Sequence, residues 1–131
     1  MKKKGILNAQ LSAAIARLGH KDTFLIGDAG MPIPLGVETI DLAVTAGVPT
    51  FRQVLTAVLD EEFCEGLTLA EEIKTENPAL HEFILAQLPD LTPEYIPHDE
   101  LKKMSAKCRF AIRTGEFSPY PNVILRAGVV F

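Results

Sequence analysis

The chain has 131 residues, with 13 basic side chains, 17 acidic side chains and a formal net charge of −4. This is the length of one domain, and the negative balance argues against a nucleic-acid partner, whose phosphates attract a basic face. Hydrophobic residues make up 47% and charged residues 23%, yet no stretch reaches the ~20 apolar residues of a membrane helix. We expect one domain over residues 1–131 without membrane insertion, and either an interface with another subunit or an unusually apolar monomer.

The N-terminal segment and the two cysteines indicate the cellular compartment. Met1 and three lysines start the chain, but Asn8, Gln10 and Ser12 interrupt any apolar signal-peptide segment. Neither Cys64 nor Cys108 belongs to a Cys-x-x-Cys pair. We therefore expect a cytoplasmic protein with reduced, buried thiols rather than zinc ligands or a redox pair.

The first half of the chain alternates helical and extended patterns. Apolar spacing predicts a helix over residues 8–18, with Gly19 as its C-terminal cap. Residues 23–26 predict a strand that ends in the Gly-Asp-Ala-Gly segment 27–30, after which two prolines impose an extended loop. A second strand over 37–42 and a helix over 51–59 follow.

The second half continues this alternation. We predict a strand over 66–69 and a helix to about residue 88 that begins with Asn77 as cap and Pro78 in its first turn. Short elements follow, a strand at 95–96, a helix over 98–104 and a strand over 108–112. The apolar segment 123–131 predicts a buried strand and a C-terminus packed into the fold.

Strands that alternate with helices at this interval are typical of a layered α/β sheet. We expect a three-layer α/β/α sandwich, Rossmann-like, with a mostly parallel but mixed sheet. In such folds the loops at the strand ends usually carry the functional site. Motifs for nucleotide binding, zinc proteolysis and serine hydrolysis are absent from the sequence.

Polar residues in these loops are the candidates for a site. His20 follows the first helix, where the helix dipole favours a protonated ring, and is either an acid or a solvated turn residue. Asp28 either approaches a ligand or caps its own turn, and His98 either points over the strand ends or simply starts its helix. Tyr120 and Asn122 suit a sugar, whose apolar face stacks and whose hydroxyls need donors and acceptors.

Several segments together resemble the D-ribose pyranase family, relatives of the fucose mutarotases. The resemblance spans the whole chain and is most specific in Asp-Ala-Gly-Met-Pro-Ile-Pro at 28–34 and Arg-Thr-Gly-Glu-Phe-Ser-Pro-Tyr at 113–120. It implies a cofactor-free, metal-free cytoplasmic enzyme that interconverts the pyranose and furanose rings of D-ribose and supplies the form that a kinase accepts. It also implies a homo-oligomer, a pentameric ring that is commonly stacked into a homodecamer.

The resemblance also implies roles for particular residues. His20 matches the proton donor of the family, and Asp28, His98, Tyr120 and Asn122 match its sugar-binding positions. Pro121 matches a position of the same segment that is usually alanine. This departure removes a backbone N–H, so we expect contact there through shape or the carbonyl only.

The implied chemistry agrees with the residues. Ring interconversion passes through the open aldehyde, so a proton must reach the ring oxygen while another leaves the anomeric hydroxyl. Histidine titrates near ~6.5 and suits both steps. If residues 23–27 are extended, His20 and Asp28 lie roughly 20 Å or more apart at ~3.3 Å per residue. We therefore expect a site between neighbouring protomers, with His20 from one and Asp28 and the Tyr120 loop from the other.

Two alternatives stay open at this point. One is a fucose-type mutarotase, which shares the same overall pattern. The other is a non-catalytic ring that binds ribose and is associated with its transport, which needs Tyr120 and Asn122 but does not need His20 to titrate.

Overall fold

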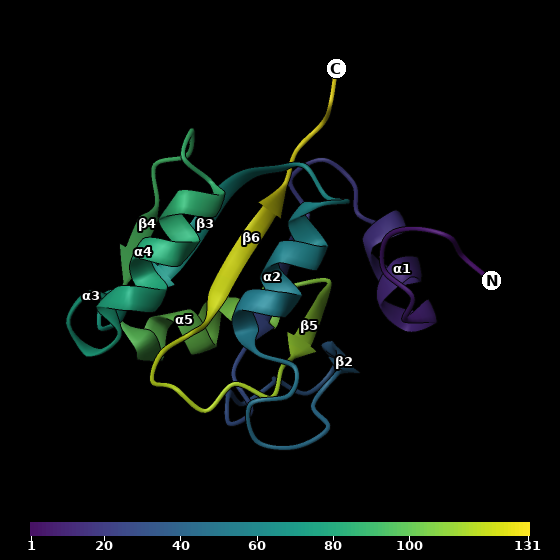
Figure 1. Ribbon diagram of the computed structural model, residues 1–131. Coiled ribbons are helices and arrows are strands. Elements are labelled where there is room, and N and C mark those ends of the chain that lie inside the picture. Colours follow the sequence, from purple (N-terminus) through teal and green to yellow (C-terminus); the bar gives the residue numbers. More distant parts are fainter.

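A six-stranded sheet of order β2-β5-β1-β6-β3-β4 organises the chain, which the computed structural model describes over residues 1–131 (Figure 1). Neighbouring strands are parallel except at β6, which is antiparallel to both β1 and β3. The expected α/β class with a mostly parallel, mixed sheet is confirmed. The strands are β1 (Thr23–Gly27), β2 (Glu38–Asp41), β3 (Cys64–Ala70), β4 (Glu94–Ile96), β5 (Phe110–Arg113) and β6 (Val123–Ala127).

Helices cover both faces of the sheet. Successive residues of β1 show this, because Phe24 and Ile26 join the larger apolar core whereas Leu25 joins a smaller core with Leu101 of α5. The larger core takes its helical residues from α1, α2, α3 and α4, and Figure 1 shows α2 and α4 in front of the sheet. The helices are α1 (Ala9–Ala16), α2 (Phe51–Leu59), α3 (Ile73–Glu76), α4 (Pro78–Gln87) and α5 (His98–Met104), and a 3-10 turn spans Ser105–Lys107.

Local sequence signals account for the two N-terminal helices. The side chain of Asn8 accepts a hydrogen bond from the Leu11 N–H and so caps α1. At α2, Thr50 and Gln53 form a reciprocal capping box. None of the helices combines the length and the apolar character of a membrane-spanning segment.

The two cysteines are free and buried, as predicted. Burial raises the pKa of the Cys64 thiol to about 12. Burial likewise raises the pKa of the Cys108 thiol to about 11. Both side chains therefore stay protonated at neutral pH and act as small apolar groups.

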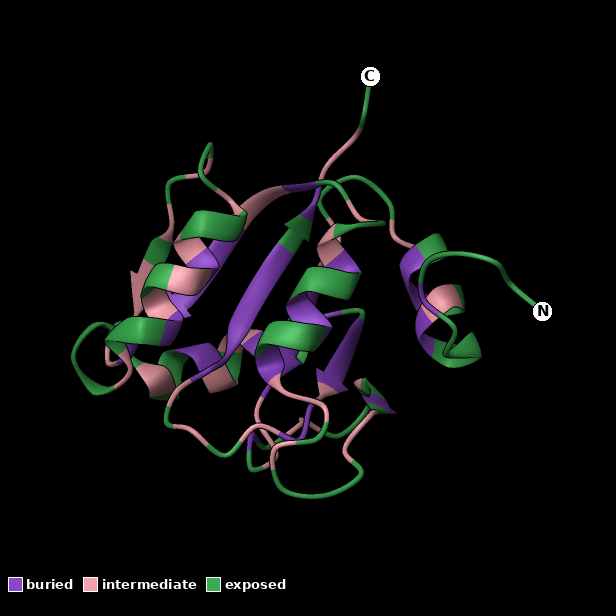
Figure 2. Cartoon of the chain, in the orientation of Figure 1, coloured by how far each residue is buried: buried purple, intermediate pink, exposed green.

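The prediction of a packed C-terminus is wrong. Strand β6 ends at Ala127, and Val130 and Phe131 are 84% and 101% exposed. The chain leaves the sheet here because β6 runs out of a pairing partner. Ala127 lies opposite Cys64, the first residue of β3, and no strand continues beyond it. Figure 2 shows the last residues as an exposed tail that leaves the sheet.

The region before α4 also differs from the prediction. A short helix, α3, precedes it, and the predicted cap Asn77 makes no capping hydrogen bond to α4. The side chain of Asn77 instead donates to the loop that precedes β6. Sequence spacing places a cap correctly along the chain, but a distant loop can compete for the same side chain.

The capping box of α2 allows a stability prediction. We expect Thr50→Ala to lower the free energy of unfolding by about 1 kcal/mol, because it removes the acceptor of the Gln53 N–H. Urea denaturation at fixed protein concentration measures this. Thr56→Ala, at an exposed position of the same helix, is the control, and an equal loss in both variants would contradict the role of the cap.

Candidate active site

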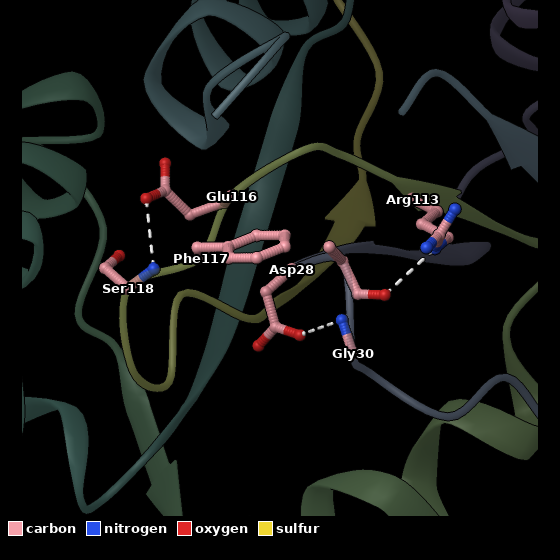
Figure 3. Close-up of a pocket in the computed structure, with 7 residues that line it drawn as sticks. Asp28, Gly30, Arg113, Glu116, Phe117 and Ser118 are labelled. Atoms are coloured by element: carbon pink, nitrogen blue, oxygen red, sulfur yellow. Dashed lines mark hydrogen bonds between the residues drawn. The ribbon is translucent and has the colours of Figure 1, made fainter. Parts of the chain in front are cut away.

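Asp28 and Asn122 form the rigid centre of the site. Asp28 directly follows β1, and Asn122, which is fully buried, directly precedes β6. The amide of Asn122 accepts the Asp28 N–H at 3.0 Å and donates to Asp28 Oδ2 at 2.9 Å. The Gly30 N–H donates to the other carboxylate oxygen at 2.8 Å (Figure 3). Since β1 and β6 are antiparallel neighbours, this pair joins two adjacent strand ends.

His98 and Tyr120 lie beside this centre. Their rings meet edge to face, with centroids 5.1 Å apart and an interplanar angle of 85°. Nδ1 of His98 is buried and has no hydrogen-bond partner within the chain, which is rare for a buried polar atom and is typical of a functional position. Burial lowers the pKa of His98 and the charge of Lys102 adds to this, while Glu72, Asp28 and Asp99 oppose it. The ring is therefore neutral at neutral pH.

Tyr120 has a strained backbone. Its φ is +57°, a conformation that side chains other than Gly, Asn and Asp seldom adopt, and it precedes Pro121, which disfavours helical geometry in the residue before it. The Tyr120 carbonyl accepts the Asn122 N–H at 2.9 Å. Strain of this kind persists where the surrounding structure fixes it, often at binding sites. Pro121 is buried and has no N–H to offer.

Two residues around α3, which the sequence reasoning missed, hold this pair of rings. Both carboxylate oxygens of Glu72 accept the His98 N–H, at 3.1 and 3.0 Å. Asn77 donates to Ser118 Oγ at 3.0 Å and to the Pro119 carbonyl at 2.9 Å. The Asn-Pro pair was a visible signal, but it indicated a helix cap. Glu72 belongs to an acidic pair with Glu71, but no sequence signal indicated that it contacts His98.

An open cavity of about 380 Å³ adjoins Asp28. The Glu116 carboxylate, in the wall of this cavity, accepts the N–H of Phe51 at the start of α2. It also accepts the N–H of Ser118 (Figure 3). Burial alone would raise the pKa of Glu116, but these hydrogen bonds outweigh it and lower the pKa. The cavity is lined by Asp28, Ala29, Gly30, Arg113, Glu116, Phe117 and Ser118.

His20 lies elsewhere. It stands in the turn before β1, whereas Asp28 follows the same strand. Its Nε2 lies 3.0 Å from Glu65 Oε2, near the start of β3. The structure thus brings together Asp28, His98, Tyr120, Pro121 and Asn122 at one end of the sheet and places His20 at the other. No group of three His, Cys, Asp or Glu side chains is suited to a metal ion.

The fold is that of an α/β protein, and the polar cluster at its strand ends is a candidate small-molecule site. The RbsD / FucU transport protein family matches residues 1–130. D-ribose pyranase of Pediococcus pentosaceus is 50% identical and D-ribose pyranase 2 of Streptomyces griseus 54% identical, each over 131 residues and 100% of both chains. The chain belongs to the RbsD / FucU family, and the resemblance seen in the sequence is confirmed.

Solved structures agree with this assignment. Bacillus subtilis RbsD complexed with D-ribose superposes with a TM-score of 0.96 at 42% identity, covering 100% of both chains. The fucose mutarotase of Streptococcus pneumoniae, in complex with L-fucose, gives 0.76 at 19% identity over 95% of each chain. The second likeness concerns the fold alone.

The environment of His98 predicts its titration. We expect the ring to titrate below the ordinary value of about 6.5, because burial opposes its charged form. The contribution of His98 to the free energy of unfolding is therefore complete above the ordinary pKa. It declines as pH falls from that value toward the lower pKa of the folded protein, since the unfolded chain binds the proton more readily. Proton NMR of the ring, assigned with His98→Gln, measures the midpoint. A midpoint at or above about 6.5 would contradict a neutral site histidine.

Proposed function

We propose that residues 1–131 form one domain with D-ribose pyranase activity, which interconverts the pyranose and furanose rings of ribose. The observation that carries this proposal is identity of about half of all residues, end to end, with proteins named D-ribose pyranase. The relative complexed with D-ribose supports ribose as the ligand at 42% identity. The fucose mutarotase is much more distant, at 19%, so ribose is preferred over fucose.

The reaction needs only proton transfers. Opening the pyranose breaks the bond between C1 and the ring oxygen, which takes a proton as the anomeric hydroxyl loses one. Closing the furanose uses the C4 hydroxyl, which adds to the aldehyde carbon and loses its proton. An imidazole can donate a proton in one half and accept one in the other, and His20 is our candidate.

The cluster at the other end of the sheet supplies the sugar contacts. The Asp28 carboxylate, fixed by Asn122 and Gly30, accepts hydrogen bonds from sugar hydroxyls. The free Nδ1 of His98 accepts or donates one more, and the ring of Tyr120 covers the apolar face of the sugar. Pro121 contributes shape and its carbonyl. Asn122 completes the set by holding Asp28 in place.

One chain provides only half of such a site. His20 and Asp28 flank a strand that is extended over five residues, so one pentose cannot touch both. We therefore place each site between neighbouring protomers of a ring, a pentamer that stacks into a homodecamer. Exposed apolar residues support such an interface, because Phe63, Val130 and Phe131 are 53%, 84% and 101% exposed and the Gly128 N–H bonds to the Phe63 carbonyl.

We place the enzyme in the cytoplasm, where it supplies furanose to a ribose kinase. The two free, buried cysteines support a reducing compartment. This step matters to metabolism only where spontaneous ring exchange is slower than consumption of the furanose.

Magnetisation-transfer NMR of D-ribose tests the function. We expect the protein to accelerate exchange between pyranose and furanose signals, and His20→Ala to slow it at least about a hundredfold, as loss of a general acid does. His81→Gln is the matched control, since His81 lies on α4 against Tyr95 and should leave the exchange unchanged.

Two results would count against the proposal. If the wild type does not accelerate exchange but binds ribose, the protein is a carrier. If His20→Ala matches the wild type, another group transfers the proton. Repeating the measurement with L-fucose distinguishes the mutarotase alternative, and faster exchange of fucose than of ribose would favour it.

A further inference from the structure

The carboxylate of Glu65 holds the ring of His20. Nε2 of His20 lies 3.0 Å from Glu65 Oε2, and the other oxygen, Oε1, lies 3.2 Å from Arg126 Nε on β6. The carboxylate therefore joins the ring to a guanidinium on the neighbouring strand. The His20 side chain remains 45% exposed, so a sugar can still reach the ring.

A bulge in β3 brings Glu65 to this position. Pairing with β6 passes from Cys64 opposite Ala127 to Gly66 opposite Arg126, which leaves Glu65 as the extra residue. Bulges redirect a side chain and are frequent beside active sites. Gly66 makes room for the guanidinium, because a Cβ there would lie 3.0 Å from Arg126 Cζ. The bulge and the glycine together leave room for the Glu65 and Arg126 pair.

The charge of Glu65 determines which nitrogen of His20 carries hydrogen. The hydrogen bond from His20 lowers the pKa of Glu65 despite partial burial, and the charges of His20, Arg126 and Lys21 lower it further. An ionised carboxylate can only accept hydrogen bonds. Nε2 must therefore carry a hydrogen, and in the neutral ring Nδ1 carries the lone pair.

We propose that Glu65 is the positioning residue of His20, which holds hydrogen on Nε2 and leaves Nδ1 to exchange a proton with the sugar. This inference rests on the proposed function, in which His20 is the proton donor. Arg126 binds not the oxygen that contacts His20 but the second oxygen of Glu65, and so fixes the orientation of the carboxylate. A carboxylate that is fixed by a second hydrogen-bond partner also sets the rotation of the imidazole that it binds.

The proton balance closes with Glu65 ionised throughout. In opening, protonated His20 gives its Nδ1 proton to the ring oxygen as the C1–O bond breaks, and the anomeric hydroxyl gives its proton to water. In closure, the C4 hydroxyl bonds to C1 and gives its proton to Nδ1, while the carbonyl oxygen takes back the proton that water accepted. His20 ends protonated as it began, and the negative Glu65 stabilises that charged ring.

Nitrogen NMR of the ring tests the tautomer directly. With ¹⁵N-labelled wild-type protein, assigned by His20→Ala, we expect neutral His20 to carry hydrogen on Nε2. In Glu65→Gln the carboxamide can accept or donate, so we expect both tautomers. Hydrogen on Nδ1 in the neutral wild type would overturn the proposal. Because the wild type alone decides this, the test stands even if the variant fails to fold.

Kinetics supply the second readout. We expect Glu65→Gln to lower kcat about tenfold with KM unchanged, because Asp28 and the Tyr120 loop still bind the sugar. Glu38→Gln is the matched control. It breaks a comparable carboxylate pair with Arg17, 3.1 Å long and exposed on β2, and should retain wild-type kcat.

The outcomes separate the two proposals. If Glu65→Gln retains the wild-type kcat while His20→Ala exchanges ribose slowly, the role of Glu65 is overturned and His20 remains the proton donor. No acceleration by the wild type would overturn the proposed function, whereas equal acceleration by wild type and His20→Ala would overturn the role of His20 and with it the catalytic role of Glu65. In that case the tautomer measurement still decides whether Glu65 positions the ring.

Discussion

The extended backbone of β1 is the constraint on which the site depends. A strand of five residues spans roughly 17 Å at ~3.3 Å per residue, and it carries His20 before its start and Asp28 after its end. The strand cannot bend to bring them together, because it is hydrogen-bonded on both sides, to β5 and to β6. Each chain therefore has two separate polar sites, and a small sugar can contact only one of them.

The two polar sites are built differently. The Asp28 site is held by buried contacts between distant segments, with Asn122 fully buried and Glu72 and Asn77 fixing His98 and the loop before Tyr120. This rigidity suits recognition of hydroxyl groups, whose positions are fixed on the sugar ring. The His20 site is more exposed and rests on charged partners, which suits the proton transfer that we propose for His20.

Much of this could be predicted from the sequence. Strand periodicity placed β1 between His20 and Asp28, and the separation of the two residues follows from that strand alone. Loop composition also marked Tyr120 and Asn122. The partners of the site could not be predicted, because Glu65 depends on a bulge and Glu72 on contact between elements far apart in the chain. The exposed C-terminal tail was missed because apolar composition does not reveal where a strand loses its pairing partner.

Complementation between two inactive variants tests the central claim, that neighbouring protomers share each site. His20→Ala and Asp28→Ala proteins are unfolded and refolded together, and ribose exchange is measured by magnetisation transfer. If one protomer supplies His20 and its neighbour Asp28, random mixing restores about a quarter of the sites, those that receive an intact residue from each side. Each variant refolded alone should stay inactive. A mixture that remains as inactive as its components would contradict the account, because it would mean that both residues act within one chain.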